Sequence, residues 1–107
     1  MTQYIFVYKS NEAFDWSALP KEEVKKVMDA WGTWLGAMGP ALKGGDAFKF
    51  GGKTVSKNGK NEADNLLTGF AIVEAKDFDE ALEIAQNAPI VVSGQGSVEV
   101  YEAFGVM

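Results

Sequence analysis

The stretch that most constrains the fold runs from Thr68 to Pro89 and reads TGFAIVEAKDFDEALEIAQNAP. It opens with Gly69–Val73, a continuous apolar run of strand type, and after a short break it continues as an amphipathic helix. A strand that is apolar on both sides must be covered on both faces. Other elements of this chain, or of a partner, must therefore pack on both faces of this strand.

Residues 3–8, QYIFVY, predict a second strand of the same kind, because five of the six are β-branched or aromatic. Alternation places its side chains on two faces, with Tyr4, Phe6 and Tyr8 on one and Ile5 and Val7 on the other. Both faces of this strand are again apolar. We therefore expect it to be central in a sheet.

A first helix is predicted from Pro20, a residue favoured at the first helical position, to Gly39-Pro40. Its apolar side carries Trp31 and Trp34 at helical spacing. Gly32 and Gly36 lie inside this helix at a cost of about 1 kcal/mol each relative to alanine. We favour close packing of the helix on the sheet as their role. The alternative is a small cavity beside the two glycines with a tryptophan as its wall.

A second helix begins with Asp77 and Glu80, which are spaced as in a capping box, and ends at Asn87 and Pro89. The other elements are predicted as strands, with the polar residues 57–65 forming a mobile loop that is a candidate lid. The predicted strands are Ala47–Phe50 and Lys53–Ser56 around a Gly51-Gly52 turn, Leu67–Ala75, and Ser97–Phe104.

The order strand, helix, two or three strands, helix, strand predicts one α+β domain over residues 1–107 with a ferredoxin-like βαββαβ sandwich. In this fold two helices cover one face of an antiparallel sheet. The other face remains apolar, and a second copy of the chain is its simplest cover. We therefore expect a homodimer with the sheets packed face to face.

Composition excludes several classes of function. The chain has a net charge of −5 and no run of basic residues, which disfavours nucleic-acid and membrane-surface binding. It has no cysteine and no histidine, so a catalytic triad with histidine, a thiol nucleophile and histidine or cysteine metal sites are excluded. We expect neither a metal nor a cofactor. No signal peptide or membrane helix is predicted, and a cytoplasmic location is the default.

The carboxylates Asp46 and Asp64 are the candidate acid–base residues, because both lie in predicted loops near glycine turns. The favoured structural alternative is that they bond nearby backbone amides in turns. Glu99 and Tyr101 share one face of the last strand and are further candidate ligand-binding residues. If that face meets a partner sheet, Glu99 is buried with a shifted pKa, or it forms a salt bridge across the interface.

Tyr8 together with Trp34 is a candidate lining for a slot that takes a flat ligand, and Trp31 is a further candidate ligand-binding residue. The structural alternative is that all three are ordinary core aromatics. The loop aromatics Phe14 and Trp16 are predicted to pack against the edge of the core, with a role as a ligand lid as the alternative.

An ordered set of segments across nearly the whole chain resembles the YCII-related family, specifically its DGPF-type branch. The segments are Trp31-Gly32-Thr33-Trp34, Leu42-Lys43-Gly44-Gly45, Gly69–Ala75, Asp79-Glu80-Ala81-Leu82 and Val98-Glu99-Val100. This resemblance implies a dimeric α/β barrel. Where the branch has Asp-Gly-Pro-Phe this chain has Asp64-Asn65-Leu66-Leu67, and the histidine–aspartate pair of the suspected catalytic relatives has no histidine here.

Three functions remain open. The first is a small-molecule-binding dimer with a cleft between the sheet and the first helix. The second is a cofactor-independent enzyme that uses a carboxylate and a tyrosine for proton transfer on a small, aromatic substrate. The third is a structural or partner-binding module without a pocket. We favour the first.

Overall fold

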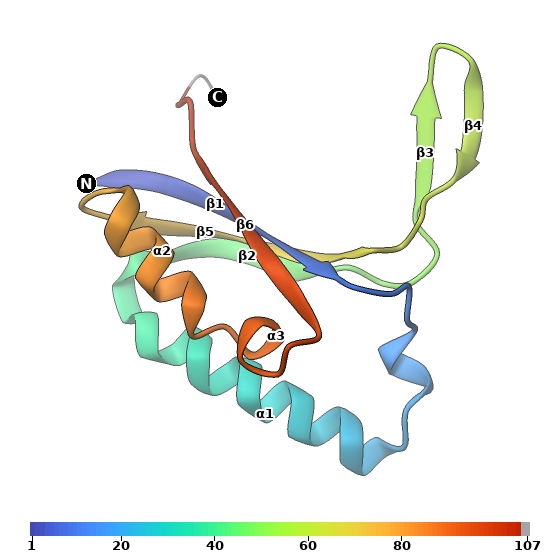
Figure 1. Cartoon of the computed structure of the whole chain (residues 1–107), viewed down its shortest axis with the longest axis horizontal. Helices are drawn as coiled ribbons and strands as arrows, with labels where there is room; N and C mark the ends of the chain where they lie inside the picture. The colour runs from blue at the N-terminus through green and yellow to red at the C-terminus, as the bar shows by residue number, and fades with distance from the viewer. Residues whose placement is uncertain (106–107) are drawn as a thin grey trace.

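The computed structural model describes residues 1–105 as a four-stranded sheet with helices on one side and a separate two-stranded hairpin (Figure 1). The strands are β1 (Thr2–Ser10), β2 (Leu42–Ala47), β3 (Lys53–Ser56), β4 (Gly59–Glu62), β5 (Leu67–Ala75) and β6 (Gly96–Glu102). The α-helices are α1 (Lys21–Met38), α2 (Phe78–Gln86) and α3 (Pro89–Val92), and two single 3₁₀ turns are η1 (Trp16–Ala18) and η2 (Gly39–Ala41).

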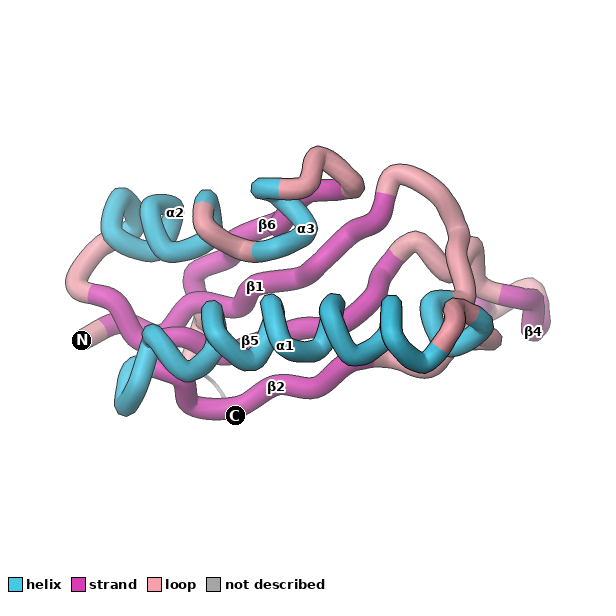
Figure 2. The backbone as a smooth tube through the Cα atoms, turned by 90° about the horizontal axis from the view of Figure 1, so that it is seen from below, coloured by secondary structure: helices cyan, strands magenta, loops and turns pink. Residues whose placement is uncertain are grey.

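The four strands lie in the order β2-β5-β1-β6, and every neighbouring pair is antiparallel. With the hairpin set aside, this is the strand order of a ferredoxin-like βαββαβ sandwich, and the fold prediction is confirmed. Both strands predicted to be central, β1 and β5, are the two inner strands of the sheet. Figure 2 shows α1 and α2 side by side over the same face of the sheet.

The core lies between that face and the helices. The β1 side chains Tyr4, Phe6 and Tyr8 are buried there, together with Val73 of β5 and Trp34 of α1. Alternation along β1 was therefore predicted correctly from the sequence. Burying this apolar layer removes large aromatic surfaces from water and is the main driving force for the fold.

The opposite face of the sheet, which we call the open sheet face, is only partly shielded from solvent. Ile5 and Val7 of β1 and Phe70 and Ile72 of β5 are half-buried there. Tyr101 of β6 lies directly opposite Ile5 and is 54% exposed. No helix of the described residues covers this face (Figures 1 and 2).

Strand β2 is not where the sequence predicted it. The expected strand Ala47–Phe50 is replaced by Leu42–Ala47, which includes the two glycines of the segment. Gly45 has a φ of 143°, and a Cβ placed on it would lie 2.3 Å from the carbonyl oxygen of Phe70. The absence of a side chain at Gly45 therefore allows β2 to pair closely with β5, just after a bulge between Leu42 and Gly44.

The prediction of a mobile loop at residues 57–65 was also wrong in part. It contains β4, which pairs with β3 to form a hairpin that projects from the side of the sheet away from the helices (Figure 1). The turn of this hairpin is at Lys57-Asn58, inside the segment predicted to be a loop. The turn predicted at Gly51-Gly52 between Ala47–Phe50 and Lys53–Ser56 is not formed, because β2 ends at Ala47 and does not pair with β3. We call residues 53–62 the hairpin arm.

Helix α2 begins as predicted, because the Asp77 carboxylate accepts a hydrogen bond of 2.9 Å from the Glu80 amide. Asn87 is the C-terminal cap, whereas Pro89 starts the short helix α3. Both expectations for Gly32 and Gly36 were wrong: the glycines are exposed, and a Cβ at either would contact nothing within 4 Å.

None of the helices formed by the described residues is both long enough and apolar enough to span a membrane.

Candidate functional site

The aromatic cluster consists of Tyr8 from β1 and Trp31 and Trp34 from α1. The ring centroid of Tyr8 lies 4.7 Å from that of Trp31 and 6.0 Å from that of Trp34, and the two indoles are 5.6 Å apart. Trp31 and Trp34 are three residues apart, so both project from one side of α1. The structure thus brings together three of the five residues predicted to bind a ligand.

Trp34 has a structural role within this cluster. Its indole Nε1 donates a hydrogen bond of 3.1 Å to the carbonyl oxygen of Ile84 in α2, and its ring stacks on Phe6. The side chain is 8% exposed. Trp34 therefore fixes α1 to α2 and to the sheet, as a core residue does, while the half-buried Trp31 forms the outer edge of the cluster.

The Tyr8 hydroxyl is the unusual group of the cluster. Tyr8 is 6% exposed, and its hydroxyl is buried with no hydrogen-bond partner among the described residues. Burial raises the pKa of Tyr8 well above its ordinary value of 10, so the group stays neutral and able to donate a proton in a hydrogen bond. A buried hydroxyl without a partner costs about 1–3 kcal/mol. Such a group in a native structure indicates a missing partner.

Glu99 and Tyr101 lie on the other face of the sheet. In the register of β1 and β6, Glu99 is opposite Val7 and Tyr101 is opposite Ile5, so both belong to the open sheet face. The sheet therefore separates them from the aromatic cluster. The five predicted ligand residues do not form one site in a single chain. Glu99 is exposed here, and whether a partner buries it stays a prediction.

The Tyr101 hydroxyl donates a hydrogen bond of 3.1 Å to Oε1 of Glu99. This hydrogen bond raises the pKa of the Tyr101 phenol, and the carboxylate charge and partial burial act in the same direction. A phenol and a carboxylate in direct contact are two of the groups that can transfer protons in a chain without histidine.

The candidate acid–base residues Asp46 and Asp64 occupy separate places. Asp46 lies in β2 opposite Phe70, on the open sheet face, and its Oδ1 accepts a hydrogen bond of 2.8 Å from the Ala47 amide. Asp64 lies outside the sheet, and its Oδ1 accepts one of 3.0 Å from the Leu66 amide. Both are exposed and bond nearby backbone amides, as the structural alternative expects.

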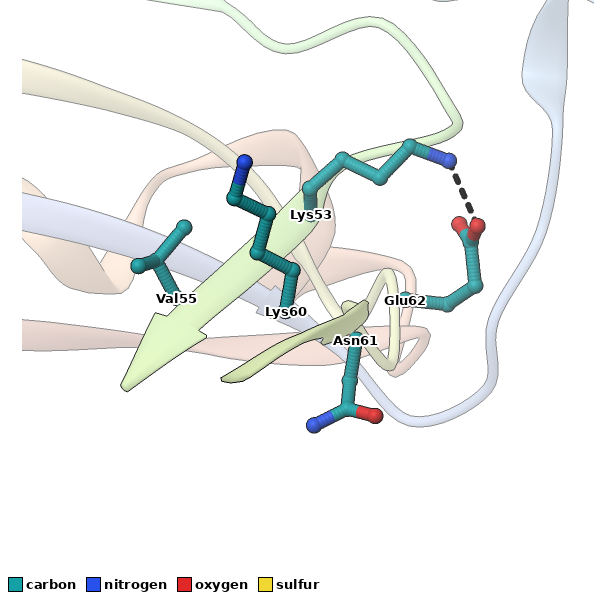
Figure 3. A pocket seen from close by; sticks show the side chains of 5 residues that line it. All are labelled: Lys53, Val55, Lys60, Asn61 and Glu62. Atoms are coloured by element: carbon teal, nitrogen blue, oxygen red, sulfur yellow. Dashed lines mark hydrogen bonds and ion pairs between the residues drawn. The ribbon is translucent and has the colours of Figure 1, made fainter. Parts of the chain in front are cut away.

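Two surface hollows lie away from the aromatic cluster. One, of about 580 Å³, is open to solvent on the hairpin arm and is lined by Lys53, Val55, Lys60, Asn61 and Glu62 (Figure 3). The other is a crevice with almost no free volume, and its aromatic lining residues are Phe14, Trp16, Phe48 and Phe50. Phe14 is 53% exposed, so it is not packed against the core edge as predicted. Neither hollow lies between the sheet and α1.

Asn65 is a structural residue that the site prediction missed. Its Oδ1 accepts hydrogen bonds of 2.9 and 3.0 Å from the Gly51 and Gly52 amides, and its Nδ2 donates one of 3.0 Å to the Ala63 carbonyl. Its φ of 59° is the left-handed conformation that asparagine tolerates better than most residues. The available signal was the Asp64-Asn65 pair just before the predicted strand Leu67–Ala75, because both residue types favour turns. Asn65 joins the two strands of the hairpin arm at their base.

Comparisons with known proteins support the fold. A solved structure with a similar fold is 5-chloro-2-hydroxyhydroquinone dehydrochlorinase (TftG) from Burkholderia phenoliruptrix AC1100, in complex with 2,5-dihydroxybenzoquinone. Its TM-score is 0.58 and its sequence identity is 16%, and the match covers 92% of this chain and 89% of that one. No curated protein sequence matches. A family model described as the YCII-related domain matches residues 1–104. The chain therefore belongs to the YCII-related domain family.

Proposed function

We propose that the protein binds a small planar molecule between the sheet and helix α1, and that the Tyr8 hydroxyl donates a hydrogen bond to it. The observation that carries this proposal is the buried Tyr8 hydroxyl, which has no partner within residues 1–105. The indoles of Trp31 and Trp34 flank it and provide the flat apolar walls that aromatic ligands prefer. A ligand oxygen would remove the cost of the unpaired hydroxyl.

The ligand class that fits is a planar ring with a carbonyl or hydroxyl oxygen at its rim. Burial raises the pKa of the Tyr8 hydroxyl, with no contribution from a charged side chain of the described residues. A neutral acceptor therefore suits the site better than a fully charged one. The similarly folded TftG, whose structure holds 2,5-dihydroxybenzoquinone, supports a quinone or hydroxylated aromatic ring.

Entry of the ligand requires α1 to move relative to the sheet, because the hydroxyl is sealed in the structure. Two observations make α1 suitable for such a movement. Trp34 is its one buried residue, and Gly32 and Gly36 lower its helix propensity without packing on anything. In this proposal helix α1 opens to admit the ligand, whereas the sequence had suggested residues 57–65 as the lid.

The test is a titration with 2,5-dihydroxybenzoquinone, followed by tryptophan fluorescence and by the melting temperature. We expect saturable binding to the unaltered chain and about tenfold weaker binding to Tyr8→Phe, because one hydrogen bond of about 1 kcal/mol or more is lost. Tyr101→Phe, on the opposite face, is the matched control and should bind normally. Equal affinity of Tyr8→Phe, or a loss confined to Tyr101→Phe, would contradict the proposed position.

A second copy of the chain is proposed to cover the open sheet face. The half-buried Ile5, Val7, Phe70 and Ile72 form a continuous apolar strip across the two central strands, and such strips are typical of interfaces. Light scattering over a wide concentration range should give twice the mass of one chain. Ile72→Lys should give a folded monomer, and a monomer for the unaltered chain would refute the dimer.

Membership of the DGPF-type branch is proposed on the basis of Asn65. This residue occupies the place of the glycine in the Asp-Gly-Pro-Phe signature, and it has a φ of 59°, where glycine is favoured. Asparagine is the substitute that keeps this backbone conformation. The preceding Asp64 also keeps its turn-forming hydrogen bond to the Leu66 amide.

A second candidate function is cofactor-independent proton transfer on the open sheet face. The hydrogen bond between Tyr101 and Glu99 favours it, and Asp46 lies on the same face. Turnover of a hydroxylated aromatic should then be reduced by Glu99→Gln and by Asp46→Asn. Asp64→Asn, which is remote from this face, is the matched control. Activity that survives both changes would exclude this function.

A further inference from the structure

The hairpin arm makes few contacts with the rest of its own chain. All eight residues of its two strands are exposed, and Val55 is 75% exposed. Lys53, Val55, Lys60 and Glu62 share one face in the β3–β4 register, and Figure 3 shows Asn61 pointing the other way. An isolated two-stranded hairpin is marginally stable in water. A surface that packs against the arm is therefore missing from the single chain.

The arm nevertheless has a defined position at its base. Besides the three hydrogen bonds of Asn65, the Ala63 amide donates one of 3.0 Å to the Gly52 carbonyl. From this base the arm extends on the side of the sheet away from the helices, which is the side of the open sheet face (Figure 1). The arm and the open sheet face thus border the same region of space.

The charge of the arm is opposite to that of the rest of the protein. Residues 53–62 contain three lysines and one acidic residue, Glu62, a net charge of +2. The remaining residues carry seven lysines and fourteen acidic residues, a net charge of −7. Within the arm Lys53 pairs with Glu62, while Lys57 and Lys60 make no ion pair among the described residues.

We infer that the hairpin arm of one chain grips a second copy of the chain docked on the open sheet face, with Lys57 and Lys60 against the partner's acidic surface. This inference rests on the proposed sheet-face dimer and adds a second contact to it. Asp46 and Glu99 are exposed on the open sheet face and lack ion pairs within residues 1–105, so they offer the complementary charge. Val55 supplies the apolar contact. In a two-fold dimer each copy gives one arm and receives one.

A second copy is favoured as the occupant because of this charge complementarity. Two bodies of strongly negative charge repel each other, and a basic arm from each reduces that repulsion. Contacts between exposed charges are screened by salt, so the arm should strengthen the dimer most at low ionic strength. The sheet contact, which is apolar, should depend much less on salt.

The experiment measures the dimer dissociation constant by sedimentation equilibrium at low and high salt, using the full chain. The arm variant is Lys57→Glu with Lys60→Glu. The matched control is Lys21→Glu with Lys25→Glu, an identical change of net charge on the exposed side of α1. We expect the arm variant to weaken the dimer about tenfold at low salt and much less at high salt. The α1 control should weaken it about twofold or less at both salt concentrations.

Ile72→Lys separates this inference from the sheet-face dimer on which it rests. If Ile72→Lys gives monomers while the arm and control variants behave alike, the arm has no role and the sheet-face dimer stands. If the arm variant weakens a dimer that Ile72→Lys leaves intact, the arm contact stands and the sheet-face cover is refuted. A monomer at all concentrations refutes both. Binding of single-stranded DNA by the unaltered chain that is lost in the arm variant would assign the arm to a nucleic acid and overturn the inference.

Discussion

The hydroxyl of Tyr101 donates a hydrogen bond to the carboxylate of Glu99, its neighbour two residues earlier on the same face of β6, at 3.1 Å. The hydrogen bond raises the pKa of Tyr101, so the folded chain holds this proton more tightly than the unfolded chain does. The raised pKa of Tyr101 therefore contributes stability to the folded chain. This contribution is fully present below the pKa of about 10 that the phenol has in the unfolded chain, and it is lost as pH rises through the pKa of the folded chain.

We therefore predict that Glu99→Gln lowers the pKa of Tyr101, because an amide acceptor carries no charge. The measurement is the phenolate absorbance during an alkaline titration, with Tyr101→Phe used to assign the transition. An unchanged titration in Glu99→Gln would mean that the two side chains do not interact in solution.

The buried hydroxyl of Tyr8 gives a prediction on stability. Tyr8→Phe should leave the free energy of unfolding unchanged or raise it by about 1 kcal/mol, because it removes a polar group that has no partner. Urea unfolding at neutral pH tests this. A loss of stability would show that the hydroxyl has a partner in the folded chain without ligand.

The same residue predicts the alkaline limit of stability. Burial raises the pKa of Tyr8, so the folded state disfavours its ionised form, and stability falls as pH rises above about 10, where the unfolded phenol ionises. Tyr8→Phe should lose less stability than the unaltered chain over this range. The difference between the two chains, measured by urea unfolding at several pH values, cancels the contribution of other groups. Parallel curves would contradict the prediction.

Asn65 should control the order of the hairpin arm. Asn65→Ala removes three hydrogen bonds and leaves a non-glycine residue at a φ of 59°, at a total cost of about 2–3 kcal/mol. Asn65→Gly keeps the backbone conformation and should cost about 1 kcal/mol less. Amide hydrogen exchange at Ala63, whose amide bonds the Gly52 carbonyl, measures the local opening. Equal exchange in both variants would show that the conformation at Asn65 is not under strain.

The glycines of α1 and of β2 should respond in opposite ways to alanine. Gly32→Ala and Gly36→Ala should each stabilise the chain by about 0.5–1 kcal/mol, since both positions are helical and a Cβ meets nothing. Gly45→Ala should destabilise it by about 2 kcal/mol or more, because the Cβ would overlap the Phe70 carbonyl. Thermal unfolding of the three variants is the measurement. A loss of stability at Gly32 or Gly36 would point to a contact made by α1 outside the single chain.

The strands with strong alternation were predictable from the sequence. In β1 the aromatic residues Tyr4, Phe6 and Tyr8 alternate with Ile5 and Val7, and the structure buries the first set against the helices. The capping interaction between Asp77 and Glu80 was predictable for the same reason, because it depends on residues close in the chain.

The glycine-rich middle of the chain was less predictable. The sequence predicted a strand at Ala47–Phe50, but β2 lies earlier and includes Gly45, where the absence of a side chain allows close contact with Phe70 and Ala71 of β5. That contact partner is 25 residues away, so the local sequence does not reveal it. The polar segment that became β4 has no hydrophobic pattern, and its strand depends on pairing with β3.

The candidate site shows the same division between local and long-range information. The spacing of Trp31 and Trp34 on one side of a helix is a local property, whereas their contact with Tyr8 depends on how α1 packs on the sheet. The separation of Glu99 and Tyr101 from that cluster is also a long-range property. Alternation puts these two residues on one face of β6, but the pairing register with β1 decides which face that is.

The sequence by itself determined the order of the main elements, the two central strands and the exclusion of histidine and cysteine chemistry, because these depend on composition and on short-range periodicity. Only the tertiary structure decided that the Tyr8 hydroxyl has no partner within residues 1–105, that the open sheet face carries Glu99 and Tyr101, and that the hairpin arm lies on the same side of the sheet as that face. These properties depend on strand register and on contacts between residues distant in the chain. The free energies of these contacts depend on packing throughout the domain and not on any single segment.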